Sequence, residues 1–210
     1  MKVLLINGSP HEKGCTYTAL KEIEKTLQEE GIDTVLFQLG TAPVRGCAGC
    51  GACWRSKSCR CVFDDDAVNR ALDLAQECDG MIVGSPVHYA SAGGSVTALM
   101  DRMFYAGSRM MAGKPGAAIV SARRAGTTAA IDQLNKYFII SGMPIAASQY
   151  WPMVHGNTPE QVMQDEEGLQ IMRMLARNMA WMIKSFALAR EQGILPPARE
   201  KERKVTNFIR

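Results

Sequence analysis

Short runs of aliphatic residues alternate with longer stretches of helical periodicity along the chain. The runs are apolar at nearly every position, which is typical of strands buried on both faces of a parallel sheet. Strands of this kind that alternate with helices predict an α/β fold, with helices on both faces of the sheet. The predicted strands are residues 3–7, 34–39, 81–85, 117–121 and 144–148, and the predicted helices are residues 16–30, 67–78, 95–105, 127–141 and 166–189.

The last predicted helix is apolar over much of its circumference. Apolar residues recur in it at spacings of three and four, which makes one seam, and Ile171, Met174 and Trp181 add a second apolar flank. So wide an apolar surface predicts burial against the sheet and also against another subunit, in a homodimer or homotetramer. The residues of the seam are Met172, Leu175, Met179, Met182 and Phe186.

A chain of 210 residues is long enough for one α/β domain, which we predict at residues 1–190, followed by a basic tail at residues 191–210. A net charge of +3 is too small to predict nucleic-acid binding. We find no secretory signal and no run of roughly twenty apolar residues, so neither export nor a membrane span is expected. Seven cysteines in such a chain indicate thiols or metal ligands in a reducing compartment, the cytoplasm.

The loop after the first predicted strand, residues 7–16 (NGSPHEKGCT), combines features that bind phosphate. Gly8 and Gly14 permit tight turns, Ser9 and Thr16 offer hydroxyls, and the following helix start supplies free N–H groups. The loop matches neither the Walker pattern nor G-x-G-x-x-G, and a plain structural turn is the alternative. Cys15 stands at the helix start, where a thiol pKa can be lowered, although we favour a passive role.

Two further loops follow predicted strands at the same edge, where open parallel sheets bind their ligands. Residues 84–94 (GSPVHYASAGG) place His88 and Tyr89 before small residues that would admit a planar aromatic ligand. His88 is a candidate proton donor, with a structurally bonded histidine as the alternative. Residues 121–128 (SARRAGTT) carry Arg123 and Arg124, which suit a reduced ring or a phosphate, with ordinary surface charge as an equal alternative.

A loop predicted at residues 45–63 holds five of the seven cysteines. Cys47, Cys50 and Cys53 are each separated by two residues, and Cys59 and Cys61 follow closely. This spacing suits a 4Fe–4S cluster, while a zinc ion held by four thiolates and a thiol-rich loop without metal are the alternatives. Any four-ligand site leaves one of the five cysteines unused.

Several of these motifs resemble those of a known family. GSPHEKGCT resembles the GSP-x-x-x-G-x-T phosphate loop of flavodoxin-like NAD(P)H-dependent FMN reductases, and GSPVHYASAGG resembles their ring-binding loop. CAGCGAC followed by DDD resembles the cysteine segment of the iron–sulfur flavoprotein branch of that family. SARRAGTT, QYWPMVHG and QDEEGLQIMR are also similar, so the resemblance covers nearly the whole chain except its tail.

The resemblance implies a three-layer flavodoxin-like fold, doubly wound, with a five-stranded parallel sheet in the order 2-1-3-4-5 and FMN at its switch point. Cys15 stands where the family usually has asparagine, and His88 where tyrosine is common. The implied phosphate contacts are Ser9, Lys13, Cys15 and Thr16, the implied ring contacts are Pro86, Val87, His88 and Tyr89, and the residues implied to close over the ring are Arg123, Arg124 and Gly126. The implied cluster ligands are Cys47, Cys50, Cys53 and Cys59, with Cys61 as a spare.

The expected function is that of an FMN-dependent NAD(P)H oxidoreductase. Hydride would pass from nicotinamide to flavin N5, and electrons would pass on to a quinone, an azo or nitro aromatic, a flavin or a ferric species. Because the flavin performs the chemistry, only His88 and Tyr89 are candidate catalytic residues. The alternative is an iron–sulfur flavoprotein that relays electrons to a protein partner through a cluster. The sequence argues strongly against a signalling receiver module, because Asn7 and Ser85 stand where it needs acidic residues.

Overall fold

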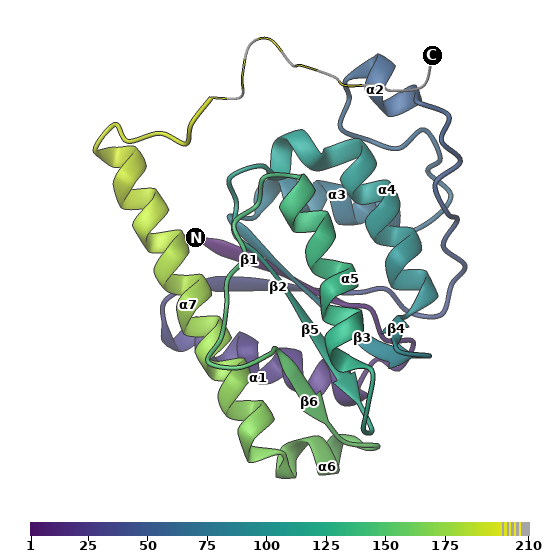
Figure 1. Cartoon of the computed structure of the whole chain (residues 1–210), viewed down its shortest axis with the longest axis vertical. Coiled ribbons are helices and arrows are strands. Elements are labelled where there is room, and N and C mark those ends of the chain that lie inside the picture. The colour runs from purple at the N-terminus through teal and green to yellow at the C-terminus, as the bar shows by residue number, and fades with distance from the viewer. Residues whose placement is uncertain (199, 201, 203, 205, 207–210) are drawn as a thin grey trace.

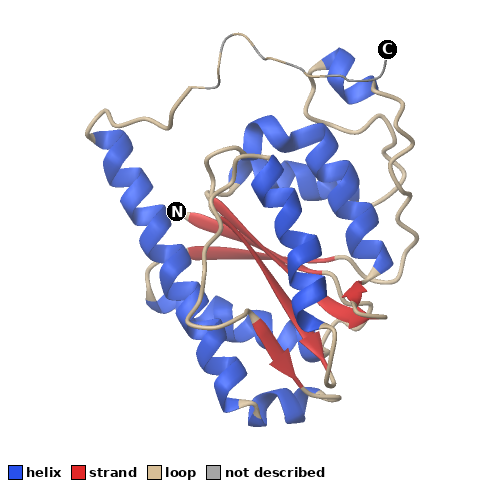
Figure 2. Cartoon of the chain, in the orientation of Figure 1, coloured by secondary structure: helices blue, strands red, loops and turns tan. Residues whose placement is uncertain are grey.

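The sheet of the molecule is parallel and has helices on both faces, as predicted (Figure 1 and Figure 2). The computed structural model describes residues 1–198, 200, 202, 204 and 206. The strands are β1 (Lys2–Asn7), β2 (Asp33–Gln38), β3 (Gly80–His88), β4 (Ser91–Ala92), β5 (Gly116–Ala122) and β6 (Met153–His155). The path through the sheet is β2-β1-β3-β5-β6, and β4 pairs antiparallel with the end of β3. When only the parallel strands are counted, this is the predicted order 2-1-3-4-5.

Two sets of helices cover the two faces of the sheet. The helices are α1 (Cys15–Glu29), α2 (Ala52–Ser56), α3 (Val68–Glu77), α4 (Gly94–Met111), α5 (Thr127–Ile140), α6 (Pro159–Gln164) and α7 (Glu166–Glu191). Residues of α1, α6 and α7 share one core with one face of the sheet, and residues of α3, α4 and α5 share a second core with the other face. The result is the three-layer arrangement of a flavodoxin-like fold.

Successive residues of β1 enter different cores, which explains why the strand is apolar at every position. Val3 and Leu5 pack with α1 and α7, whereas Leu4 and Ile6 pack with α3 and α4. All four side chains are fully buried. A strand covered on both faces has no solvent side, so the alternation of a half-exposed strand is absent.

The prediction of the fifth strand at residues 144–148 is wrong. That segment makes one isolated bridge, between Ile145 and Gly116, and the fifth parallel strand is β6. Residues 144–152 run along the edge of the sheet beside β5. Regular pairing begins only near the end of β5, where the backbone N–H of Val120 donates to the carbonyl of Pro152 at 3.1 Å.

The final helix forms as predicted, but its buried seam differs from the predicted one. Met172, Leu175 and Met179 are buried, and the seam continues through Ile183 rather than through Met182 and Phe186, which are half-buried. The buried face therefore follows the 3.6-residue helical period along this 26-residue helix. Trp181 is exposed on the opposite flank. The predicted basic tail, residues 191–210, lies partly outside the described residues.

None of the helices in the described part of the chain is both long and apolar enough to cross a bilayer.

Candidate functional site

Three loops meet at the edge of the sheet where the parallel strands end. They follow β1, β3 and β5, which are neighbours in the sheet (Figure 1). The backbone N–H of Gly8 donates to the carbonyl of Gly84 at 2.9 Å, which joins the first loop to β3. The Thr16 and Ser121 hydroxyls hydrogen-bond at 2.8 Å, which joins the first loop to β5. The predicted phosphate, ring and closing loops are thus brought together.

The loop between β1 and α1 is held by the fully buried side chain of Asn7. Its Oδ1 accepts from the backbone N–H of Ser9 at 3.2 Å, and its Nδ2 donates to Oε1 of Gln38 and to the carbonyl of Glu12. Gln38 in turn donates to the carbonyl of Ser9 at 2.8 Å. Neither residue was among the predicted site residues. A polar residue at the end of a buried strand could have identified Asn7 as a site residue from the sequence.

The start of α1 has the properties of an anion site. Gly14 is its N-cap and supplies no side-chain cap, so the first N–H groups of the helix are left for a ligand. Ser9 is buried and its hydroxyl accepts from the N–H of His11 at 3.1 Å, while Lys13 is exposed. A phosphate monoester suits this donor set, because free N–H groups and the helix dipole both favour negative charge.

The buried pair Thr16 and Ser121 gives a test of how tightly the loops are joined. Thr16→Val leaves the Ser121 hydroxyl buried without a partner, which we expect to cost about 1–3 kcal/mol of unfolding free energy. Adding Ser121→Ala removes the orphaned hydroxyl, so the double variant should cost less than the sum of the single ones. Urea unfolding of flavin-free protein measures this cycle. Thr18→Val is the control, and additive costs at Thr16 and Ser121 would refute the coupling.

The segment predicted as a loop after the third strand is instead the end of β3, which continues to His88, and its turn into β4, and it offers a partly exposed surface. Pro86 and Val87 are half-buried, whereas His88 and Tyr89 are exposed. Tyr89 and its neighbour Ala90 have left-handed backbones, with φ of 50° and 56°. Such strain in non-glycine residues costs on the order of 1 kcal/mol each and is frequent at ligand sites.

The loop after β5 packs directly on the hairpin of β3 and β4. Gly126 has a φ of +87°, and a Cβ there would lie 2.7 Å from Cα of Ala90 and 3.1 Å from Cγ1 of Val87. Only glycine fits so close an approach at this backbone conformation. Arg123 and Arg124 project from the same loop and are exposed, and no acidic side chain among the described residues pairs with either.

Cys15 is not an activated thiol. Burial raises its pKa, and Glu160 adds to that effect. The Cys15 thiol donates to the carbonyl of Gly156 at 3.6 Å, which ties the start of α1 to the segment after β6. A lowered pKa at the helix start is therefore wrong, and the passive role that we favoured fits the structure.

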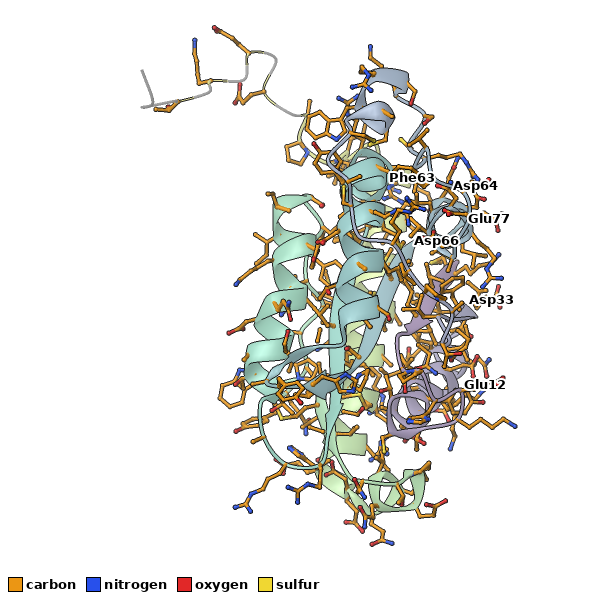
Figure 3. All side chains as sticks on the ribbon, turned by 90° about the vertical axis from the view of Figure 1, so that its right-hand side faces the viewer. Glu12, Asp33, Phe63, Asp64, Asp66 and Glu77 are labelled. Atoms are coloured by element: carbon orange, nitrogen blue, oxygen red, sulfur yellow. The ribbon has the colours of Figure 1, made fainter. Side chains whose placement is uncertain are left out.

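The cysteine loop lies at the other end of the molecule from these three loops. Its short helix α2 rests on the second half of α4, where Trp54 Nε1 donates to the carbonyl of Tyr105 at 2.9 Å. Figure 3 shows Phe63 and Asp66, at the end of this loop, far along the long axis from Glu12 in the β1–α1 loop. Because α4 begins just after the hairpin of β3 and β4, its length separates the two regions.

The five loop cysteines divide between two cavities. Cys47, Cys50, Cys53 and Cys61 line one cavity together with Phe63 and Arg102. Cys59 lines a second, with Cys53, Lys57 and Arg109. Burial raises the pKa of Cys53, and Cys61 and Cys47 raise it further. Within the described residues, no three His, Cys, Asp or Glu side chains are close enough to ligate a single metal ion.

A buried arginine that the sequence analysis missed anchors this loop. Arg102 of α4 is only 2% exposed and pairs with Asp66. Its guanidinium also donates to the carbonyls of Arg45 and Phe63, at 3.2 and 2.9 Å, so it binds both ends of the cysteine loop. Burial acts to raise the pKa of Asp66, but hydrogen bonds from Arg102 and two backbone N–H groups outweigh it and lower that pKa.

Comparison with known proteins agrees with the geometry of the site. The sequence profile described as NADPH-dependent FMN reductase matches residues 1–158. The chain belongs to that family. As a member, it is an NAD(P)H-dependent flavin oxidoreductase whose cofactors are FMN and NADPH.

Two curated relatives and two solved structures show which individual proteins this FMN reductase is similar to. An iron-sulfur flavoprotein of Methanocaldococcus jannaschii is 31% identical over 193 residues, which cover 88% of this chain and 98% of that protein. An FMN reductase (NADPH) of Pseudomonas putida is 29% identical over 101 residues, 48% of this chain and 46% of that protein. A flavone reductase superposes with a TM-score of 0.70 at 15% identity, covering 89% of this chain and 64% of that one. A flavodoxin from the domain Archaea gives 0.60 at 17%, covering 88% and 99%. At these identities the structural matches show the fold alone.

Proposed function

We propose that this enzyme takes hydride from NAD(P)H and reduces a small-molecule acceptor, namely a quinone, an azo or nitro aromatic, a flavin or a ferric species. The observation that carries the proposal is the meeting of three loops at one sheet edge, joined through Gly8, Gly84, Thr16 and Ser121. When bound there, FMN supplies a ring that accepts hydride at N5 and returns electrons to a second substrate.

The chain's own residues bind and orient that cofactor in the proposed site. The uncapped start of α1, with Ser9, Lys13 and the backbone N–H groups of Cys15 and Thr16, would hold the phosphate. The half-buried Pro86 and Val87 would lie against the ring, with His88 and Tyr89 at its open side as candidate catalytic residues. The remaining proposed contacts are Arg123, Arg124 and Gly126. The two arginines would stabilise negative charge on the ring.

A small acceptor fits the exposure of this site. His88, Tyr89, Arg123 and Arg124 are all exposed, so donor and acceptor can reach the same ring face in turn. We also propose a homodimer or homotetramer in the cytoplasm, where the seven cysteines remain free thiols or ligands. Exposed Trp151 and Trp181 support self-association.

The test is the visible spectrum of protein purified without oxygen, with iron and sulfide assays beside it. We expect one FMN per chain, bleaching of the flavin absorbance by NADPH, and its return when one of the named acceptors is added. Protein that binds no flavin after incubation with FMN would refute the proposal. Protein that holds reduced flavin but reduces none of the acceptors would refute the small-molecule assignment only.

The second candidate is an iron–sulfur flavoprotein that passes electrons to a protein partner through a cluster on the cysteine loop. It is supported by the cavity lined by four cysteines and by the name of the Methanocaldococcus relative. Along α4, Gly94 and Tyr105 are eleven residues apart, or roughly 16 Å at 1.5 Å per residue, so a relay within one chain must cross that length. Iron and sulfide in the anaerobic protein distinguish this candidate from the first.

A further inference from the structure

The hairpin of β3 and β4 is held by a side chain of α5 that lies outside the three site loops. Oε1 of Gln133 accepts two hydrogen bonds from β4, from the hydroxyl of Ser91 at 2.7 Å and from the backbone N–H of Ala92 at 2.9 Å. We propose that Gln133 is a positioning residue that holds this hairpin against the flavin ring and thereby sets the rate of hydride transfer. The inference rests on the proposed function, because it concerns the ring side of that site.

The hairpin has little stability of its own. β4 has two residues and forms two residue pairs with the end of β3. The turn between the strands is made by Tyr89 and Ala90, which both have a positive φ, of 50° and 56°. Tight hairpin turns with positive φ favour glycine and asparagine, because these residues adopt that backbone at low cost. Two pairs and a strained turn do not fix the hairpin, so its position depends on contacts from outside.

Two other contacts act at the ends of the hairpin. The buried hydroxyl of Ser85 accepts from the backbone N–H of Gly93 at 2.9 Å, which closes the open end. Gly126 packs against Ala90 of the turn, but it has no side chain with which to bond it. Gln133 therefore supplies side-chain hydrogen bonds that fix β4 between these two points.

The helix that carries Gln133 is a firm support. Gly126 is the N-cap of α5, and Gln133 follows it by seven residues, or about two helical turns, so both lie on the same side of the helix. Leu134 and Phe138 of α5 are fully buried in the core that the helix shares with the sheet. A hairpin bonded to α5 therefore keeps its place relative to the strands that carry the rest of the site.

The residues that Gln133 bonds are not those proposed to contact the flavin ring, which are residues 86–89. Ser91 is paired with His88 across the hairpin. Ala92 is paired with Val87, which is half-buried. A displacement of β4 is thus passed directly to two of the proposed ring contacts. Because hydride transfer requires the donor and flavin N5 at close distance and in the correct orientation, a small shift of the ring lowers the rate.

The experiment compares Gln133→Met with Gln133→Glu in full-length FMN-bound protein. Methionine has nearly the length of glutamine but no oxygen acceptor, whereas the carboxylate of glutamate can accept both hydrogen bonds. In stopped-flow measurements at saturating NADPH, flavin reduction in Gln133→Met should be about tenfold slower, and the visible circular dichroism of the bound flavin should change. Gln133→Glu should keep the wild-type rate and spectrum. So should the matched control Lys136→Met, which places methionine at an exposed position of the same helix.

A wild-type rate and spectrum in Gln133→Met overturn the proposal even if the unfolding midpoint falls, because the residue would then be structural only. An equal loss of rate in Gln133→Glu also overturns it, since the acceptor oxygen would then not be the cause. If Gln133→Met fails to fold, Ser91→Ala removes one of the two donors and should show the same changes at smaller size, and an unchanged rate and spectrum in that variant overturn the proposal. Failure of the proposed function is distinct, because the wild-type protein itself would then bind no FMN or leave it oxidised in the presence of NADPH.

Discussion

Arg102→Met is expected to destabilise the protein by about 3–5 kcal/mol, because it leaves the Asp66 carboxylate buried without its partner. The same change removes the donor to the carbonyls of Arg45 and Phe63 and to Sγ of Cys61. Urea unfolding of flavin-free protein at neutral pH measures the loss. Arg109→Met is the matched control, since it removes an exposed arginine from the same helix and should change stability by less than about 0.5 kcal/mol.

The double variant Arg102→Met/Asp66→Asn separates the buried charge from the lost packing. It should recover part of the stability, because no uncompensated carboxylate remains. In the wild type, the lowered pKa of Asp66 contributes stability above its ordinary value of 3.8, and this is lost as pH falls through the lower folded pKa. In Arg102→Met, burial raises that pKa, so protonation of Asp66 favours the folded state. The deficit of the single variant should therefore shrink toward pH 4, and a deficit that does not depend on pH would contradict this account.

The sheet and the site loops could be predicted from the sequence because both depend on local signals. β1, β2, β3 and β5 each contain a short, mainly aliphatic run, and glycine and serine stand at or just after the ends of β1, β3 and β5, at the edge where parallel sheets bind ligands. The three loops after β1, β3 and β5 are brought together by the strand order alone, so their motifs identify a shared site before any contact is known. The individual roles of Ser9, His88 and the arginines remain predictions.

The features that sequence reasoning missed depend on contacts between distant residues. A charged residue on a helix is ordinarily solvated, and nothing local distinguishes Arg102 from the exposed Arg109. Its partners Asp66 and Arg45 are 36 and 57 residues away, so its burial follows only from the tertiary fold. β6 was missed because it has three residues, too few for a periodic pattern, and pairs only with the end of β5.

The division of the loop cysteines between two cavities also depends on contacts between distant residues. Spacing alone admits either Cys59 or Cys61 as a fourth ligand, because both follow Cys53 within a few residues. What separates them is the side-chain amide of Asn69 in α3 and the guanidinium of Arg102 in α4. Neither residue belongs to the cysteine motif, so the spacing of the motif cannot show which of Cys59 and Cys61 lines the first cavity.

Gly8→Ala is expected to weaken FMN binding by about 100-fold, which corresponds to about 2.7 kcal/mol or the loss of one to two charge-assisted hydrogen bonds. An added Cβ would lie 2.3 Å from Cγ2 of Val96 and 2.7 Å from the carbonyl oxygen of Gly84. The oxygen belongs to the backbone of β3 and cannot move away, so the β1–α1 loop must shift instead. That shift displaces Ser9 and the start of α1 from the proposed phosphate position.

Titration of FMN fluorescence with flavin-free protein measures the effect, and two further variants show where it arises. Gly46→Ala adds the same methyl group in the cysteine loop, where nothing lies within 4 Å, and should leave FMN affinity unchanged. Gly8→Ala/Val96→Ala removes one of the two clashes and should recover only part of the affinity, because the contact with the Gly84 carbonyl remains. Full recovery would assign the effect to Val96 alone. Wild-type affinity in Gly8→Ala would show that the phosphate does not bind at this loop, and the flavin site would then have to lie elsewhere on the sheet.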